Sequence, residues 1–184
     1  MPARLTVLSG PSGVGKGSVV QVLRRLVPHV WISVSCTTRR PRPGERDGIE
    51  YRFVDRAQFD EMVAEDALLE HAAFAGNCYG TPRSPVLKHL AAGTPTLLEI
   101  ELEGARQVRR SMREAHFVFL APPSVDELVH RLSGRGTESA GDVAARLARA
   151  QVEMAAASEF DDVVVNENVE QAARDVAALV AEND

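Results

Sequence analysis

Lysine is scarce in this chain of 184 residues, and an excess of positive charge is lacking. Of 21 basic residues only Lys16 and Lys88 are lysines, and the net charge is −5. Nucleic acids and anionic membranes attract proteins with an excess of positive charge, so neither is expected as a partner. The basic residues are therefore expected to act locally.

Cysteines are also few, and long apolar runs are missing. Cys36 and Cys78 lack the spacing of metal ligands, which favours free thiols in a reducing compartment over a disulfide. No apolar run approaches the length of a membrane span, and the N-terminus has no signal-peptide pattern. We therefore expect a soluble, cytoplasmic protein.

Lys16 lies in a glycine-rich segment that follows the apolar run Leu5 to Leu8. The segment matches the phosphate-binding pattern G-x-x-x-x-G-K, but Gly17 stands where the pattern has Ser or Thr. Glycines let successive backbone N–H groups turn towards phosphate oxygens, and a compact ammonium suits the narrow cradle. The alternative is a glycine-rich strand-to-helix turn that binds no ligand. The candidate P-loop consists of Gly10, Pro11, Ser12, Gly13, Val14, Gly15, Lys16, Gly17 and Ser18.

Short apolar runs predict the strands of a parallel sheet. Such runs are typical of strands that are covered on both faces. The length of the chain suits one substantial domain. Together these features predict the α/β class, with a three-layer αβα P-loop core. The expected strands are Arg4 to Ser9, Thr96 to Leu102, His116 to Ala121 and Val163 to Val165.

Apolar residues at helical spacing and capping signals predict the helices. A helix should follow the P-loop, where Val19, Leu23, Leu26 and Val27 recur at helical spacing. Other helices are expected to start at residues that can cap a first turn. These starts are Asp55 (for a helix to about Glu65), Thr81 (before Pro82 as the first helical residue), Ser124 and Asn168.

Two segments interrupt the alternation of strands and helices. From Trp31 to about Pro95, short strand-like pieces such as Arg52 to Val54 are broken by turns, and we predict an inserted subdomain. Between Arg131 and Glu153 lies an arginine-rich stretch broken by glycines, which we interpret as a mobile cover.

The first arginine cluster lies in the expected insert. Arg39, Arg40 and Arg42 crowd together beside hydroxyl groups, an arrangement that is costly unless an anion neutralises it. Guanidinium groups bind phosphate in a bidentate manner, so a phosphate monoester is the natural ligand. The alternative is a solvated turn in which Glu45 and Asp47 pair with the arginines.

The second arginine cluster lies in the expected cover. Arg146 and Arg149 are three residues apart and should share one helix face, although Arg149 could simply pair with Glu153. Arg131 and Arg135 flank a glycine turn. A phosphate cradle, a separate arginine site and an arginine-rich cover are the parts that phosphoryl transfer from a nucleotide requires.

Over almost its whole length, the sequence resembles the guanylate kinases. The resemblance rests on the order and spacing of several motifs. These are Gly-Pro-Ser-Gly-Val-Gly-Lys at 10–16, Ser35 to Glu45, Gly48-Ile49-Glu50-Tyr51, Leu69-Glu70, Gly76 to Thr81, Ala121-Pro122-Pro123-Ser124 and Arg131 to Glu138. The resemblance implies the reaction ATP + GMP ⇌ ADP + GDP with Mg²⁺, with dGMP as a further acceptor. It also implies a core at about 1–32, 96–125 and 155–184, a GMP-binding insert at about 33–95 and a lid at about 126–154.

The same resemblance implies roles for individual residues. GMP would be bound by Ser35, Arg39, Arg42, Tyr51 and Tyr79 around the phosphate, and by Glu70, Thr81 and Glu101 at the base. ATP would be bound by the P-loop and by Asn166 on the adenine side. The groups at the transferring phosphoryl would be Lys16, Arg39, Arg131, Arg135 and Arg146. The partners are expected to be nucleotides only, with the chain a monomer or a small homo-oligomer.

The chain departs from the family pattern at the predicted metal site. Glu99 and Glu101 stand where the family typically has Asp, and Gly17 removes a hydroxyl that can bind Mg²⁺. We expect Ser18 and Glu99, directly or through water, to hold the metal instead. Two other functions stay open: a related kinase that acts on a ribose bisphosphate or another nucleoside monophosphate, and a non-catalytic module that binds phosphopeptides.

Overall fold

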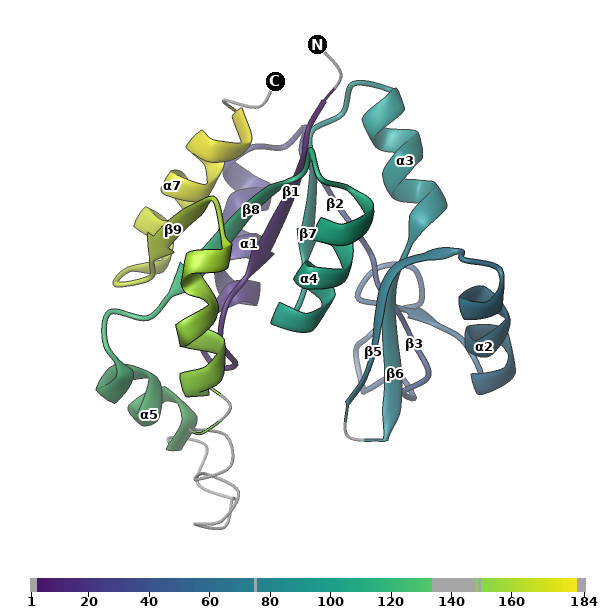
Figure 1. Cartoon of the computed structure of the whole chain (residues 1–184), viewed down its shortest axis with the longest axis horizontal. Coiled ribbons are helices and arrows are strands. Elements are labelled where there is room, and N and C mark those ends of the chain that lie inside the picture. The colour runs from purple at the N-terminus through teal and green to yellow at the C-terminus, as the bar shows by residue number, and fades with distance from the viewer. Residues whose placement is uncertain (1–2, 75, 134–147, 149, 182–184) are drawn as a thin grey trace.

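The computed structural model describes residues 3–74, 76–133, 148 and 150–181. Its central feature is a five-stranded sheet with the order β2-β7-β1-β8-β9 (Figure 1). Every neighbouring pair in this sheet is parallel, which confirms the predicted parallel α/β core. Its strands are β1 (Leu5–Ser9), β2 (Trp31–Ile32), β7 (Thr96–Glu99), β8 (His116–Ala121) and β9 (Asp162–Val165).

Helices cover both faces of this sheet because successive strand residues point to opposite sides. On one side Leu8 and Leu97 pack with helices α1 (Lys16–Leu26) and α7 (Val169–Ala181). On the other side Val7 and Leu98 pack with helices α3 (Arg83–Ala91) and α4 (Leu102–Ser111). In Figure 1, α1 lies behind the sheet and α4 in front of it. The three-layer αβα prediction is confirmed.

A second sheet has the order β4-β3-β6-β5 and stands beside α4 (Figure 1). Its strands come from the chain between β2 and β7, and α2 (Arg56–Ala64) packs on them through the buried ring of Phe59. This arrangement places a separate small sheet next to the C-terminal end of β7. The four strands are β3 (Cys36–Thr37), β4 (Arg52–Phe53), β5 (Leu68–Phe74) and β6 (Asn77–Pro82).

Three of the four predicted helix caps form. Asp55 accepts a hydrogen bond from the Gln58 amide, and the Gln58 side chain accepts one from the Asp55 amide, which completes a capping box. Ser124 and Asn168 each accept a hydrogen bond from the backbone three residues later, at the starts of α5 (Val125–Ser133) and α7.

The predicted cap at Thr81 was wrong. Strand β6 continues to Pro82, which is itself the N-cap residue of α3. The hydroxyl of Thr81 donates instead to the Glu70 carboxylate, a partner on the neighbouring strand. The strand expected from Thr96 to Leu102 was also too long, since β7 ends at Glu99 and Leu102 begins α4.

After α5, residues 150–155 are helical and lead through the 3₁₀ helix η1 (Ala156–Glu159) into β9. A bidentate ion pair joins Arg106 of α4 to Glu159 of η1.

The ring of Trp31 in β2 stacks on His89 of α3, with centroids 4.2 Å apart. Within the described ranges no helix combines the length and apolar character needed to cross a bilayer.

The two cysteines are free thiols, as predicted. Cys36 is buried between β6 and α2, and this burial raises its pKa to about 11. Cys78 is partly buried next to the same small apolar cluster.

Candidate active site

The loop from Gly10 to Gly15 joins β1 to α1 and requires glycine at both of its ends. Gly10 and Gly15 have φ of 153° and 98°. A Cβ on Gly10 would lie 2.2 Å from the carbonyl oxygen of Leu120, and one on Gly15 would lie 2.8 Å from the side-chain nitrogen of Asn166. Any side chain at either position would therefore push the loop away from β8 or β9.

Lys16 is the first residue of α1, and its side chain is almost fully buried. Its ammonium donates to the carbonyl oxygen of Gly10 at 2.6 Å and lies 3.5 Å from a carboxylate oxygen of Glu101. This conformation folds the lysine back over the loop. The positive charge thus lies close to the place where phosphate groups would bind to the backbone amides of the loop.

Three side chains from the C-terminal half of the chain support the loop. Asn166 donates to the carbonyl oxygen of Val14 at 2.8 Å, and Arg131 donates to the same oxygen at 3.3 Å. The buried carboxylate of Glu153 accepts a hydrogen bond from the amide of Ser12 at 3.1 Å. Asn166 follows β9, and its other side-chain atom, Oδ1, is buried with no partner among the described residues.

A cavity of about 660 Å³ extends from this loop to the second sheet. Because it opens at the C-terminal end of the parallel strands, it occupies the place where α/β proteins usually bind ligands. Its wall includes Ser12 and Lys16 on the loop side, Glu99 and Glu101 beyond β7, and Ser35, Tyr51, Glu70 and Tyr79 on the side of the second sheet.

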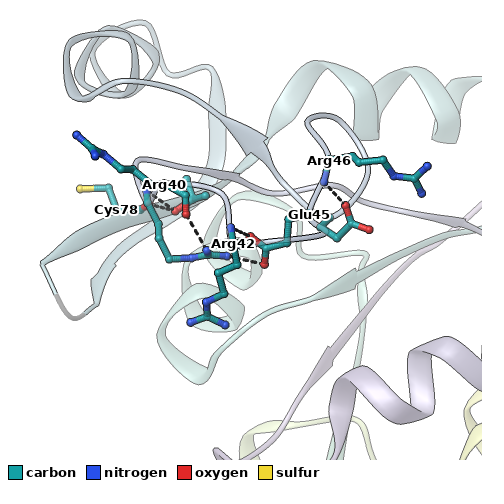
Figure 2. A network of polar contacts seen from close by, with 8 residues as sticks. Arg40, Arg42, Glu45, Arg46 and Cys78 are labelled. Atoms are coloured by element: carbon teal, nitrogen blue, oxygen red, sulfur yellow. Dashed lines mark hydrogen bonds and ion pairs between the residues drawn. The ribbon is translucent and has the colours of Figure 1, made fainter.

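In the loop that follows β3, the carboxylate of Glu45 binds the side chain of one arginine and the backbone of another. Arg39 makes a bidentate ion pair with Glu45, and the backbone of Arg42 donates to the same carboxylate at 2.8 Å. In Figure 2 the guanidinium groups of Arg40, Arg42 and Arg46 extend away from Glu45. Pairing with Glu45 raises the pKa of Arg39, and the hydrogen bond from Arg39 lowers the pKa of the Glu45 carboxyl.

The local carboxylate partner that we considered as an alternative therefore exists for Arg39. Asp47 has a different role, because its carboxylate accepts a hydrogen bond from the Phe53 amide. The guanidinium of Arg39 also lies 5.3 Å from the centre of the Tyr51 ring, which in turn meets the Tyr79 ring edge to face. Arg39 is thus held by an ion pair on one side and by the Tyr51 ring, which lines the cavity, on the other.

The most buried acid of the cavity is Glu70 on β5, which is 7% exposed. The Thr81 hydroxyl donates to Oε1 of Glu70 at 2.6 Å, and Thr81 itself is fully buried. Desolvation raises the pKa of the Glu70 carboxyl, although the hydrogen bonds from Thr81 lower it in part. The structure thus brings together two of the residues predicted to bind the base.

Glu101, the third residue predicted at the base, lies beside Lys16 at the N-cap of α4 and is half exposed. Glu99 is more enclosed: desolvation raises the pKa of its carboxyl, and the charge of Lys16 lowers it in part. A Cβ on Gly17 would lie 3.7 Å from a carboxylate oxygen of Glu99, and Ser18 is exposed on the next position of α1. Hard oxygen donors of this kind suit Mg²⁺.

Two of the predicted arginines, Arg135 and Arg146, lie outside the described residues, as does Arg149. Sequence reasoning missed Glu153 as a support of the loop and Gly104 as a close neighbour of Glu70. Both contacts join residues that are far apart in the chain, so no local pattern could have revealed them.

This fold and this cavity define a P-loop phosphotransferase of the nucleotide kinase type. Comparison with known proteins is more specific, since the guanylate kinase family model matches residues 2–183. The chain belongs to the guanylate kinase family.

Curated relatives and solved structures agree with this assignment. The chain is 63% identical to a guanylate kinase of Thermobifida fusca over 98% of this chain and 92% of that one. It is 62% identical to one from Frankia casuarinae over 98% of both. The crystal structure of guanylate kinase from Anaplasma phagocytophilum aligns with a TM-score of 0.78 at 34% identity, over 98% of this chain and 86% of that one.

Proposed function

We propose that this chain transfers the γ-phosphoryl group of ATP reversibly to GMP, giving ADP and GDP, and that dGMP is a further acceptor. The observation that carries the proposal is that one cavity, of about 660 Å³, is lined by both the P-loop lysine and the buried Glu70. Phosphoryl transfer requires both nucleotides in one enclosure that positions them and excludes water. Family membership supports the same reaction.

The donor ATP binds to the loop from Gly10 to Ser18, with its adenine near Asn166. Lys16 neutralises charge on the donor phosphates, and moves off the Gly10 carbonyl to do so. Arg131, which already contacts the loop, acts with Arg135 and Arg146 on the transferring group. No covalent intermediate is needed, because positioning and electrostatic stabilisation supply most of the rate enhancement in such transfers.

The acceptor GMP binds between the loop and the second sheet. Its phosphate meets Ser35, Arg39, Arg42, Tyr51 and Tyr79, and Arg39 exchanges part of its pairing with Glu45 for the phosphate. Its base meets Glu70, Thr81 and Glu101. Guanine offers N1–H and an amino group to a carboxylate, whereas adenine presents a lone pair at N1, so such a site can discriminate by as much as roughly 10⁴.

The residues that would hold Mg²⁺ are Ser18 and Glu99, directly or through water. The bound ion would neutralise phosphate charge. Glu99 reaches towards the position that a residue-17 side chain would occupy, which supports its role as a replacement donor.

We place this reaction in purine nucleotide metabolism in the cytoplasm, with nucleotides as the only partners of a monomer or small homo-oligomer. Residues 1–32, 96–125 and 155–184 form the core, residues 33–95 the GMP-binding insert, and residues 126–154 the lid. Retention of Lys16 and Arg131 at the loop favours the kinase over the phosphopeptide-binding alternative.

ADP release in a coupled assay tests the proposal. GMP, dGMP, AMP, CMP, UMP and a ribose bisphosphate serve as acceptors, and we expect the highest kcat/KM with GMP. Activity without a preference for GMP would overturn it. In Lys16→Ala we expect loss of turnover with GMP binding retained in calorimetry, because Lys16 acts on the donor phosphates; full turnover would contradict this role.

A further inference from the structure

Gly104 lies in the first turn of α4, directly against the Glu70 side chain. A Cβ at this position would lie 2.7 Å from Oε2, 3.2 Å from Cδ and 3.4 Å from Cγ of Glu70. The first two distances are shorter than ordinary van der Waals contact. The carboxylate therefore occupies the space that any other residue at position 104 would fill.

The backbone does not explain why this residue is glycine. Gly104 has no positive φ, and it lies inside a regular helix. In such a position alanine favours the helix over glycine by roughly 1 kcal/mol. Glycine at 104 thus weakens α4, but it leaves the space that the Glu70 side chain occupies.

The Glu70 carboxylate is consequently enclosed from two sides. The Thr81 hydroxyl donates to Oε1 from within the second sheet, and Gly104 faces Oε2 from the core. Gly104 and Glu70 both line the cavity. The direction in which the carboxylate points into the cavity depends on both neighbours.

A nearby glycine shows why substitution at 104 should spare the fold. A Cβ on Gly80 would lie 2.9 Å from the Glu70 backbone oxygen, a clash that only movement of the strand can relieve. At Gly104 the three nearest atoms all belong to the flexible side chain of Glu70. A methyl group there can be accommodated by a rotation that turns the carboxylate aside.

We propose that Gly104 determines specificity for guanine, because it leaves the space that aims the Glu70 carboxylate at the base. This inference rests on the proposed function. Two hydrogen bonds from one base to one carboxylate require both oxygens in place, so a rotated carboxylate loses the selective contact while the phosphate contacts remain.

Gly104→Ala tests the inference, with kcat/KM measured for GMP and for IMP, which lacks the 2-amino group. We expect the GMP-to-IMP ratio of kcat/KM to fall at least tenfold, with a melting temperature equal to or above that of the wild type. Ser111→Ala, at the exposed end of the same helix, is the matched control and should leave the ratio unchanged. An unchanged ratio in a folded Gly104→Ala would overturn the inference.

A double-mutant cycle with Glu70→Ala separates this contact from a general effect on α4. Without the Glu70 carboxylate, the methyl group at 104 has nothing to displace, so Gly104→Ala should not change the ratio further. Within the Glu70→Ala background, Gly104→Ala should not lower the melting temperature, and a loss there as large as in the wild-type background would also overturn the inference. A wild-type enzyme that does not prefer GMP would contradict the proposed function itself, before any variant is compared.

Discussion

The side-chain amide of Asn166 donates a hydrogen bond to the carbonyl oxygen of Val14 at 2.8 Å, which joins the end of β9 to the P-loop across 152 residues of sequence. A second bond, from Arg131, reaches the same oxygen. These two hydrogen bonds to the Val14 carbonyl therefore help to hold the backbone of the P-loop in its conformation.

Asn166→Asp places an acceptor where the Val14 carbonyl needs a donor. We expect a loss of about 1–3 kcal/mol in the free energy of unfolding, because the carbonyl of Val14 keeps only the longer bond from Arg131 and faces another oxygen. The KM for ATP should rise more than the KM for GMP. Urea unfolding and steady-state kinetics measure these effects.

Asn168→Asp is the matched control for this change. Asn168 caps α7 through its oxygen, and aspartate offers an equivalent oxygen at that position. Equal effects of the two substitutions would show that the contact with Val14 does not stabilise the loop.

Glu70→Gln should change how stability depends on pH. The folded-state pKa of Glu70 is raised by desolvation, so its contribution to stability is complete below the unfolded pKa, near 4.5, and is lost as the pH rises through the folded pKa. Glutamine carries no charge to desolvate. We therefore expect the variant to gain stability relative to the wild type at pH 8 and to lose this advantage towards pH 4.

Thermal unfolding at several pH values measures this difference. A stability difference that stays constant from pH 4 to pH 8 would contradict the raised pKa. Selectivity for GMP over AMP should fall in the same variant, since an amide cannot accept both hydrogen bonds from guanine.

Gly17→Thr restores a hydroxyl next to Glu99. A Cβ at this position would be in ordinary contact with the Glu99 carboxylate at 3.7 Å, so the fold should accept it. We expect the Mg²⁺ concentration for half-maximal rate to fall, because a direct oxygen ligand joins the site. Gly17→Ala adds the same carbon without the hydroxyl and is the control. If both variants behave alike, a hydroxyl at position 17 adds no ligand to the metal.

The two thiols should differ in reactivity towards a disulfide reagent at pH 8. With a pKa of about 11, the buried Cys36 is a thiolate in only about one molecule in a thousand. Cys78 is less buried and should account for the fast phase. Cys36→Ser should keep this phase and Cys78→Ser should lose it, with both thiols reacting in the unfolded wild type. The opposite pattern would show that β6 opens to expose Cys36.

The features that could be predicted from the sequence depend on neighbouring residues. The P-loop pattern, the capping box of Asp55 and Gln58 and the buried strands are of this kind, and each appears in the structure. The cap expected at Thr81 does not form, because its hydroxyl donates to Glu70 on the neighbouring strand, and α3 begins at Arg83 after Pro82 as its N-cap residue.

The features that escaped prediction join distant segments. Glu153 meets Ser12 across 141 residues, and Gly104 meets Glu70 on a different element of the fold. A glutamate on a helix and a glycine in a first turn have many ordinary explanations, and only the packing of the chain shows that Glu153 contacts the P-loop and that Gly104 contacts Glu70.

The stacking of Trp31 on His89 supplies an internal optical probe. The sequence contains one tryptophan, so all indole fluorescence arises at the junction between β2 and α3. The second sheet is connected to the core through α3, so a movement of this sheet relative to the core would change the environment of the ring. Emission from the natural protein, recorded in rapid mixing with nucleotides and without a label, therefore tests whether such a movement accompanies binding.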